Sequence, residues 1–502
     1  MKGKFILAID QGTTSTRCII FDRNGESIGS NQIAHKQIYP AAGLVEHDPM
    51  EILSHTIDAM KNAVNDAKIS PSDIASIGIT NQRETTVLWN RETGIPYYNA
   101  IVWQDIRTGE ICDEICKEFG EERITEKTGL PVSTYFSASK LKWLLRNINI
   151  KNDIKQGKAM FGTIDTWLLW WLTGGPQGGV FATDVTNASR TMLMNINTLD
   201  WDEDILKYLG IDKIILPEIK PSISDDSFGL LKVEGLKKFK IPITGVLGDQ
   251  QAALLGQSCF EKGEVKNTYG TGCFLLLNTG EIPVRSRHGL ITTVAYQFKN
   301  KPPFYALEGS VAIAGALIQW LKENLGIIKD INEIEHLARS VEDNSGIYFV
   351  PAFSGLFAPY WDKNARGIIT GLTRYSNRAH IARAALEATA YQTRDILNAM
   401  ERDSLITPPS LKVDGGMINN EFLMQFQADI LGIEILRPRI CETTSLGAAY
   451  AAGLAVHFWK SLKELRDNWK IDKVFRPQLS EKVREKLYDG WLEAVNKSFS
   501  RQ

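Results

Sequence analysis

The sequence has almost no net charge. Its 502 residues include 57 lysines and arginines and 59 aspartates and glutamates, a formal charge of -2. Proteins that bind nucleic acid or anionic lipid through a charged surface carry a basic excess, so this balance indicates a small partner instead. Only 18 prolines and a hydrophobic content of 43% are typical of a folded globular protein and exclude extensive disorder.

Cysteine is also scarce. The six cysteines form no CxxC pair and do not cluster with the seven histidines, which argues against a zinc site and against a disulfide framework. A reducing compartment fits this usage best, and we expect a cytoplasmic protein.

Long hydrophobic runs are missing as well. Residues 5–9 form an apolar stretch too short for the core of a signal peptide. The run 304–321 is interrupted by Glu308 and Gln319, and the run 445–459 is only fifteen residues long and rich in Ala and Gly. Both runs indicate buried structure that packs closely through small residues, and not a membrane span.

Two segments of similar design lie about half the chain length apart. The apolar stretches 5–9 and 18–21 read as strands joined by a turn with Gly12-Thr13, and the stretch 273–277 follows a turn with Gly270-Thr271. Strand and helix patterns alternate through the chain, which predicts an α/β architecture. We expect two related halves, 1–254 and 255–502, with a cleft between them.

The first turn could bind phosphate. A buried strand ends at Asp10, and Gly12 permits a tight turn that places hydroxyls and backbone N–H groups together (Thr13, Thr14, Ser15), with Arg17 as a positive charge. The alternative is a polar hairpin in which Asp10 caps a turn. No GxxxxGK[ST] motif occurs, which excludes a Walker A loop.

Two further glycine-containing turns follow predicted strands, at residues 269–272 and 413–416. Each alone is compatible with an ordinary β-turn. Three such turns spread over both halves indicate together a nucleotide held across the cleft.

Several side chains could act on a hydroxyl substrate. Asp249 follows a predicted strand at the start of a helix, where it is either an N-cap or a general base for phosphoryl transfer. Adjacent Arg83 and Glu84 could bind neighbouring hydroxyls of a polyol, or form a solvated ion pair. Trp103 and Tyr135 are, by frequency alone, more often core residues than ligands.

Several longer segments of the chain match a known family, among them AIDQGTTSTR, ITNQRETTVLWNRETG, TYFSASKL, GDQQAALLGQ, NTYGTGCFLL, VDGG and SLGAAYAAGLAV. Through them, nearly the whole chain resembles the FGGY carbohydrate kinase family, in the superfamily that includes actin, Hsp70 and hexokinase, and within it the members that phosphorylate glycerol. The resemblance implies two RNase H-like (actin-like ATPase) domains flanking a central nucleotide and substrate cleft.

The resemblance also implies roles for individual residues. Asp249 would be the general base, and Asp10 would hold Mg²⁺. The residues implied to contact glycerol, called the glycerol set below, are Arg83, Glu84, Trp103, Tyr135, Asp249, Gln250 and Phe274. Those implied to contact ATP are Thr13, Thr14, Ser15 and Arg17 in the first turn, Thr271 in the second, and Gly315, Gln319, Gly416 and Asn420 on the adenosine side.

The implied reaction is ATP plus glycerol giving ADP plus sn-glycerol 3-phosphate, with Mg²⁺, in a homodimer or homotetramer. The chain departs from the family at Glu421, beside Asn420, where relatives commonly carry a second Asn-like position. The segment 232–240 lacks the histidine and the Gly-Gly-Thr-Arg loop through which some relatives are regulated. Two alternatives stay open: an FGGY kinase for a pentulose or longer polyol, and an actin- or Hsp70-like ATPase.

Overall fold

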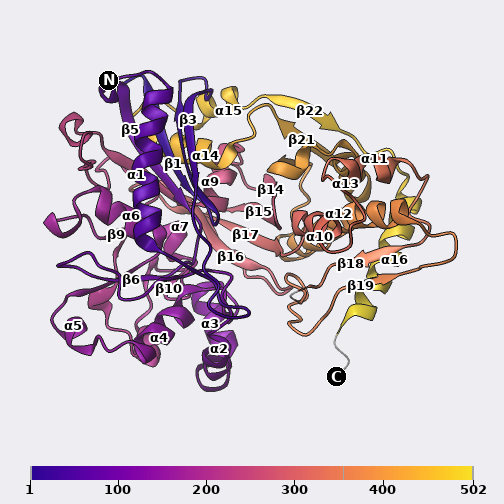
Figure 1. Cartoon of the computed structure of the whole chain (residues 1–502), viewed down its shortest axis with the longest axis horizontal. Helices are drawn as coiled ribbons and strands as arrows, with labels where there is room; N and C mark the ends of the chain where they lie inside the picture. Colours follow the sequence, from indigo (N-terminus) through magenta and orange to yellow (C-terminus); the bar gives the residue numbers. More distant parts are fainter. Residues whose placement is uncertain (1–2, 354, 500–502) are drawn as a thin grey trace.

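A computed structural model of the chain describes residues 3–353 and 355–499. Two large β-sheets lie side by side and form the centres of two lobes (Figure 1). In sheet order, the first consists of β13 (Ile243–Gly248), β5 (Ile74–Asn81), β1 (Phe5–Gln11), β2 (Ser15–Phe21) and β3 (Ser27–Ala34). The second consists of β16 (Ile291–Gln297), β17 (Pro303–Val311), β15 (Cys273–Gly280), β14 (Val265–Tyr269), β20 (Ser410–Asp414), β21 (Glu434–Pro438) and β22 (Ile471–Phe475).

The two sheets share one strand pattern. In the first, β1 pairs antiparallel with β2 and parallel with β5, β2 continues antiparallel to β3, and β5 continues parallel to β13. In the second, β14, β15, β17, β20 and β21 repeat these relations in the same order. The predicted α/β architecture is confirmed, and the repeated order supports the two related halves that the Gly-Thr turns indicate.

Parallel pairing places the candidate residues at matching sheet edges. Asp10 at the end of β1 lies opposite Thr80 on β5, and Gly248 on β13 lies opposite Asn81. Because parallel strands end at the same edge, the first turn, the Arg83 segment and the start of the helix after β13 meet there. Thr268 on β14 pairs with Asp414 on β20 and brings the other two turns together in the same way.

Two helices fill the space between the sheets. They are α9 (Asp249–Gly256) and α14 (Thr443–Ala455), and their core includes Ile6 of the first sheet and Leu276 of the second. A Cβ on Gly447 would lie 1.8 Å from the Ala252 carbonyl oxygen, so only glycine permits this helix spacing. The expectation that the run 445–459 is closely packed buried structure is therefore confirmed.

Other helices cover the outer faces and the edges of the sheets. On the first lobe, α1 (Pro49–Asp66) and α6 (Ile164–Leu172) pack on the face opposite α14. The rest of that lobe includes α2 (Gly109–Ile115), α3 (Glu121–Thr128), α4 (Ser137–Asn147), α5 (Lys151–Lys155), α7 (Val185–Ala188) and α8 (Glu203–Leu209). The second lobe has α10 (Gly315–Glu323), α11 (Glu333–Arg339), α12 (Arg378–Ser404) and α13 (Glu421–Leu431). The run 304–321 thus becomes β17 followed by α10.

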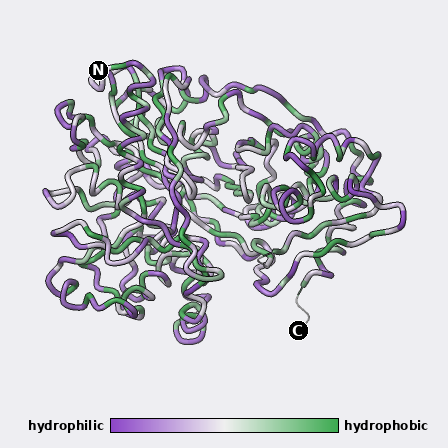
Figure 2. Tube along the Cα trace, viewed as in Figure 1, coloured by the Kyte–Doolittle hydropathy of each residue, from purple (hydrophilic) through white to green (hydrophobic). Residues whose placement is uncertain are grey.

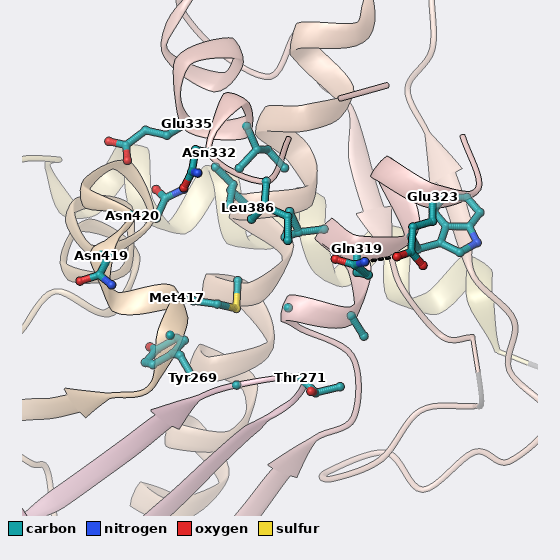
Figure 3. Close-up of a pocket in the computed structure, with 18 of the residues that line it drawn as sticks. Tyr269, Thr271, Gln319, Glu323, Asn332, Glu335, Leu386, Met417, Asn419 and Asn420 are labelled. Atoms are coloured by element: carbon teal, nitrogen blue, oxygen red, sulfur yellow. Dashed lines mark hydrogen bonds between the residues drawn. The ribbon is translucent and has the colours of Figure 1, made fainter. Parts of the chain in front are cut away.

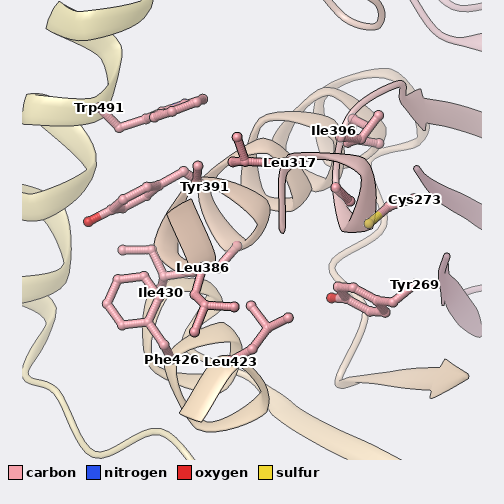
Figure 4. Packing of buried hydrophobic residues seen from close by; sticks show 14 of the residues in the cluster. Tyr269, Cys273, Leu317, Leu386, Tyr391, Ile396, Leu423, Phe426, Ile430 and Trp491 are labelled. Carbon is pink, nitrogen blue, oxygen red and sulfur yellow. The ribbon is translucent and has the colours of Figure 1, made fainter. Parts of the chain in front are cut away.

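The C-terminal tail splits between two environments. Trp491 on α16 (Glu481–Ser498) stacks on Tyr391 of α12, with ring centroids 5.4 Å apart and planes 13° from parallel (Figure 4). This helix covers the second lobe. In contrast, Leu465 on α15 (Leu462–Asn468) is buried in the core between the two sheets.

Hydrophilic residues dominate the loops at the outer edges, while hydrophobic residues follow the central strands (Figure 2). Among residues 3–353 and 355–499, no helix combines the length and the apolar character that crossing a membrane requires. The six cysteines are all free.

The close contact between α9 and α14 gives a stability prediction. Gly447→Ala should destabilise the protein by about 1–3 kcal/mol or more, because its methyl group would meet backbone that cannot move aside. Differential scanning calorimetry should show the unfolding midpoint lowered by several degrees. Gly109→Ala, in a helix with no atom near the new methyl group, is the matched control and should leave the midpoint unchanged or raise it. An unchanged midpoint for Gly447→Ala would contradict this account of the packing.

Candidate active site

The charged members of the glycerol set lie together at the edge of the first sheet. Arg83 and Glu84 follow β5, and Asp249 opens α9 after the neighbouring strand β13. Arg83 Nε lies 3.1 Å from Asp249 Oδ1 and 4.0 Å from Glu84 Oε1. Arg83 and Glu84 are buried, whereas the Asp249 side chain is 28% exposed. The solvated ion pair considered for Arg83 and Glu84 is therefore wrong.

The aromatic members form a wall beside these charges. The Trp103 ring meets the Tyr135 and Phe274 rings edge to face, with centroids 5.4 Å and 6.4 Å away. Trp103 Nε1 donates a hydrogen bond to Thr13 Oγ1 at 3.0 Å, which connects the wall to the first turn. Trp103 is half-buried, so part of this residue remains accessible.

A buried lysine links the glycerol set to the second sheet. Lys266 Nζ on β14 donates to Gln250 Oε1 at 2.5 Å, to Thr268 Oγ1 at 2.9 Å and to the Phe274 carbonyl oxygen at 3.2 Å. Burial lowers the pKa of Lys266 to about 8. The Gln250 amide and the Phe274 backbone are thus held by one cation that the sequence patterns do not single out.

Two further charged residues, Glu308 and Arg190, complete the buried network. Glu308 accepts hydrogen bonds from Arg83 Nη1 at 2.6 Å and Nη2 at 2.8 Å, and from Arg190 Nη2 at 3.2 Å. Arg190 Nε donates to Glu84 Oε1 at 2.7 Å. Burial raises the pKa of Glu308, but the charges of Arg190 and Arg83 outweigh it and hold this pKa at about 2. Glu308 could have been noticed in the sequence, because it is a carboxylate inside the apolar run 304–321, and a buried charge needs an oppositely charged partner.

The first turn is held by its own side chains. Gly12 N donates to the Ser15 carbonyl oxygen at 2.9 Å, and Ser15 Oγ accepts from Gln32 Nε2 at 2.7 Å. Arg17 donates to Gln32 Oε1 at 2.8 Å and pairs with Glu442, at the start of α14. The Arg17 charge is therefore already partly neutralised in this structure.

The predicted adenosine-side residues line a cavity of about 750 Å³ in the second lobe (Figure 3). Thr271, Gly315, Gln319, Gly416 and Asn420 all reach it, together with the apolar side chains of Ile334, Phe353 and Leu386. A Cβ on Gly315 would lie 2.6 Å from the Gly270 carbonyl oxygen, so the second turn and α10 approach closely only with glycine here.

Asn420 has a structural role as well. Its Oδ1 accepts a hydrogen bond from Leu423 N at 2.9 Å and caps the N-terminus of α13. The neighbouring Glu421 turns to Lys473 at 2.7 Å. The amide nitrogen of Asn420 is left as the group that could contact a ligand in the cavity.

The candidate metal ligands are two carboxylates and not a larger cluster of metal-binding side chains. No group of three or more His, Cys, Asp or Glu side chains in the described ranges 3–353 and 355–499 is arranged to hold an ion. Asp10 accepts from Ser445 Oγ at 2.8 Å, and burial raises the pKa of Asp10 to about 6, with the Asp249 charge adding to the rise. A carboxylate pair that disfavours its own charge suits Mg²⁺, which commonly takes one or two carboxylates and completes its shell with phosphate oxygens and water.

Comparison with known proteins agrees with this geometry. The N-terminal domain model of the FGGY family of carbohydrate kinases matches residues 5–256, and the C-terminal domain model matches residues 265–456. A glycerol kinase of Chloroflexus aggregans is 58% identical over 497 residues, covering 99% of each chain.

Solved structures give the same result. The glycerol kinase of Plasmodium falciparum with ADP is 43% identical, covers 99% of each chain and has a TM-score of 0.92. A gluconate kinase from Lactobacillus acidophilus is 25% identical, covers 98% of each chain and has a TM-score of 0.86. This chain belongs to the FGGY family of carbohydrate kinases.

Proposed function

We propose that this protein transfers the γ-phosphoryl group of ATP to glycerol and releases ADP and sn-glycerol 3-phosphate. The observation that carries the proposal is the position of the glycerol set. Its paired charges and aromatic wall lie together, and Phe274 of that wall is three residues from Thr271, which lines the 750 Å³ cavity. The strong similarity to glycerol kinases over the full chain supports this substrate.

The acceptor side binds and activates one hydroxyl. Arg83 donates to a substrate hydroxyl and Glu84 accepts from one, while Trp103 and Phe274 enclose the carbon chain. Asp249 accepts the proton of the terminal hydroxyl as its oxygen forms a bond to the γ-phosphorus and the bond to the ADP oxygen breaks. Its partial exposure leaves room for this hydroxyl beside the carboxylate.

The donor side holds ATP across the cleft. The cavity takes the adenosine, with Gly315, Gln319, Gly416 and Asn420 along its lining. Backbone N–H groups and hydroxyls of the first turn (Thr13, Thr14, Ser15) and of Thr271 face the phosphates, with Arg17 released from Glu442. Asp10 would hold Mg²⁺, which neutralises charge on the phosphates when bound.

The wider organisation follows from this arrangement. We place the division between the halves at residues 254 and 255, near the end of α9, with the reaction between the lobes. The free cysteines fit a cytoplasmic location, and a homodimer or homotetramer follows from the family resemblance.

Removing the proposed base should abolish most of the turnover. Asp249→Asn should lower kcat by about 10²- to 10⁴-fold, because the amide cannot accept the hydroxyl proton. Glycerol should still bind, as measured by isothermal titration calorimetry. Asp225→Asn, an exposed carboxylate paired with Lys299, is the matched control and should keep normal turnover. Near-normal kcat in Asp249→Asn would rule out its role as base.

The buried hydroxyl partners should make the site selective. Propane-1,2-diol should be phosphorylated about 10⁴-fold less efficiently than glycerol, because a missing hydroxyl leaves a buried polar group unpaired. A coupled assay of ADP release should be run with glycerol, with propane-1,2-diol, with a panel of longer polyols and pentuloses, and without any acceptor. Equal rates for glycerol and the diol would reject the Arg83 and Glu84 roles.

The same assay separates the alternative functions. Faster turnover of a pentulose or a longer polyol would favour a kinase for that substrate. ADP release that does not need an acceptor would favour an actin- or Hsp70-like ATPase.

The raised pKa of Asp10 predicts a pH dependence. Below about pH 6 this carboxyl is protonated and cannot hold a cation, so kcat/KM for ATP at limiting Mg²⁺ should fall as pH drops from 7 to 5. Protons and Mg²⁺ compete for the same group, so raising Mg²⁺ should move the midpoint to lower pH. Initial rates over a grid of pH and Mg²⁺ concentrations measure this shift. A midpoint independent of Mg²⁺ would exclude Asp10 as the metal contact.

A further inference from the structure

We propose that Glu308 and Arg190 are positioning residues for the polyol site, orienting Arg83 and Glu84 from the second sheet and from the segment after α7. This inference rests on the proposed function of Arg83 and Glu84. It adds that the second half of the chain contributes a buried charge to the acceptor site, besides the Phe274 ring.

The four side chains form a closed ring of alternating charge. Starting from Arg83, the contacts run to Glu308 at 2.6 and 2.8 Å and from Glu308 to Arg190 at 3.2 Å. They continue from Arg190 to Glu84 at 2.7 Å and return from Glu84 to Arg83 at 4.0 Å. All four side chains are at most 2% exposed, and their charges sum to zero. Each charge therefore has an oppositely charged neighbour on both sides and little access to water.

The ring decides which atoms of Arg83 remain available. Glu308 takes one N–H from each terminal nitrogen, and Gln251 Oε1 lies 3.2 Å from Nη1 as a second acceptor. Nε faces Asp249 at 3.1 Å. Because the guanidinium group is planar and rigid, these contacts fix its plane and leave one N–H of Nη2 for a substrate hydroxyl.

Arg190 acts on Glu84 in the same way. It occupies Oε1 of Glu84, and none of the described residues donates a hydrogen bond to Oε2. The guanidinium carbon of Arg190 also lies 5.6 Å from the centroid of the Tyr135 ring, and Arg190 Nη1 is buried without a hydrogen-bond partner among the described residues. Arg190 thus contacts Glu84 and the aromatic wall while directing the free oxygen of Glu84 to the ligand.

The supports of the ring are rigid. Glu308 lies in the middle of β17, opposite Leu276 on β15 and Ile291 on β16, so neighbouring strands fix its backbone on both sides. The segment carrying Arg190 is tied to the same sheet, because Ser189 Oγ lies 2.9 Å from Thr293 Oγ1. The backbone cannot shift to compensate for a substitution at Glu308, so such a substitution should change the orientation of the Arg83 side chain.

Steady-state kinetics on the full chain test the inference with Glu308→Gln, Glu308→Asp and Arg190→Lys. Each should raise the glycerol KM by about tenfold or more, because a charge-assisted contact to a binding residue is lost or displaced. The Kd for ADP, measured without glycerol, should stay within about twofold. Glu308→Asp keeps the charge but shortens the reach, so it separates positioning from charge alone.

Glu387→Gln is the matched control. Glu387 is a buried carboxylate paired with Arg383 at 2.8 Å, and it lies on α12, away from the glycerol set. Glu387→Gln should lower the unfolding midpoint as much as Glu308→Gln does. It should leave the glycerol KM unchanged. A raised glycerol KM in this control too would mean a general effect of destabilisation and would overturn the inference.

Two further results would overturn it. One is a normal glycerol KM in folded Glu308→Gln and Arg190→Lys. The other is a normal glycerol KM in Glu308→Asp with a raised KM in Glu308→Gln. This result would show that the negative charge of Glu308 matters but that its exact position does not. Failure of the proposed function is seen separately, since the unaltered protein would then not phosphorylate glycerol at all.

Discussion

The bidentate contact between Arg83 and Glu308 is the interaction on which the proposed acceptor site depends. It joins the loop after β5 in the first lobe to the middle of β17 in the second, with both side chains out of water. Removing one partner of a buried ion pair costs about 3–5 kcal/mol, so this contact ties the two lobes together at the edge where the glycerol set lies.

A single turn connects the two binding regions. Residues 270–272 place Thr271 on the cavity and lead directly to Phe274 in the aromatic wall. Gly315 approaches the backbone of this turn so closely that no side chain fits between them. The distance between the cavity and the aromatic wall thus depends on backbone contacts of small residues.

The near-zero net charge of the chain agrees with the pairing of opposite charges in this structure. Charges in the site are buried in compensating pairs, and even Arg17 of the first turn is paired with Glu442. In the proposed function, phosphate is met by turns that offer backbone N–H groups and hydroxyls. Lys266 donates its hydrogen bonds to uncharged oxygens. Such a site avoids a positive surface that would attract unrelated anions.

The sequence by itself determined the local elements and the chemistry of the turns. Short continuous apolar runs predicted β1, β2 and β15, and small residues in the run 445–459 predicted close packing, because both depend on neighbours along the chain. Which carboxylates meet which arginines was decided only by the tertiary structure. Glu308 reaches Arg83 across the interface between the sheets, and the separation of these residues along the chain leaves no local pattern to read. Asp249 was already a candidate base in the sequence, but only the pairing of β5 with β13 showed that it lies beside Arg83.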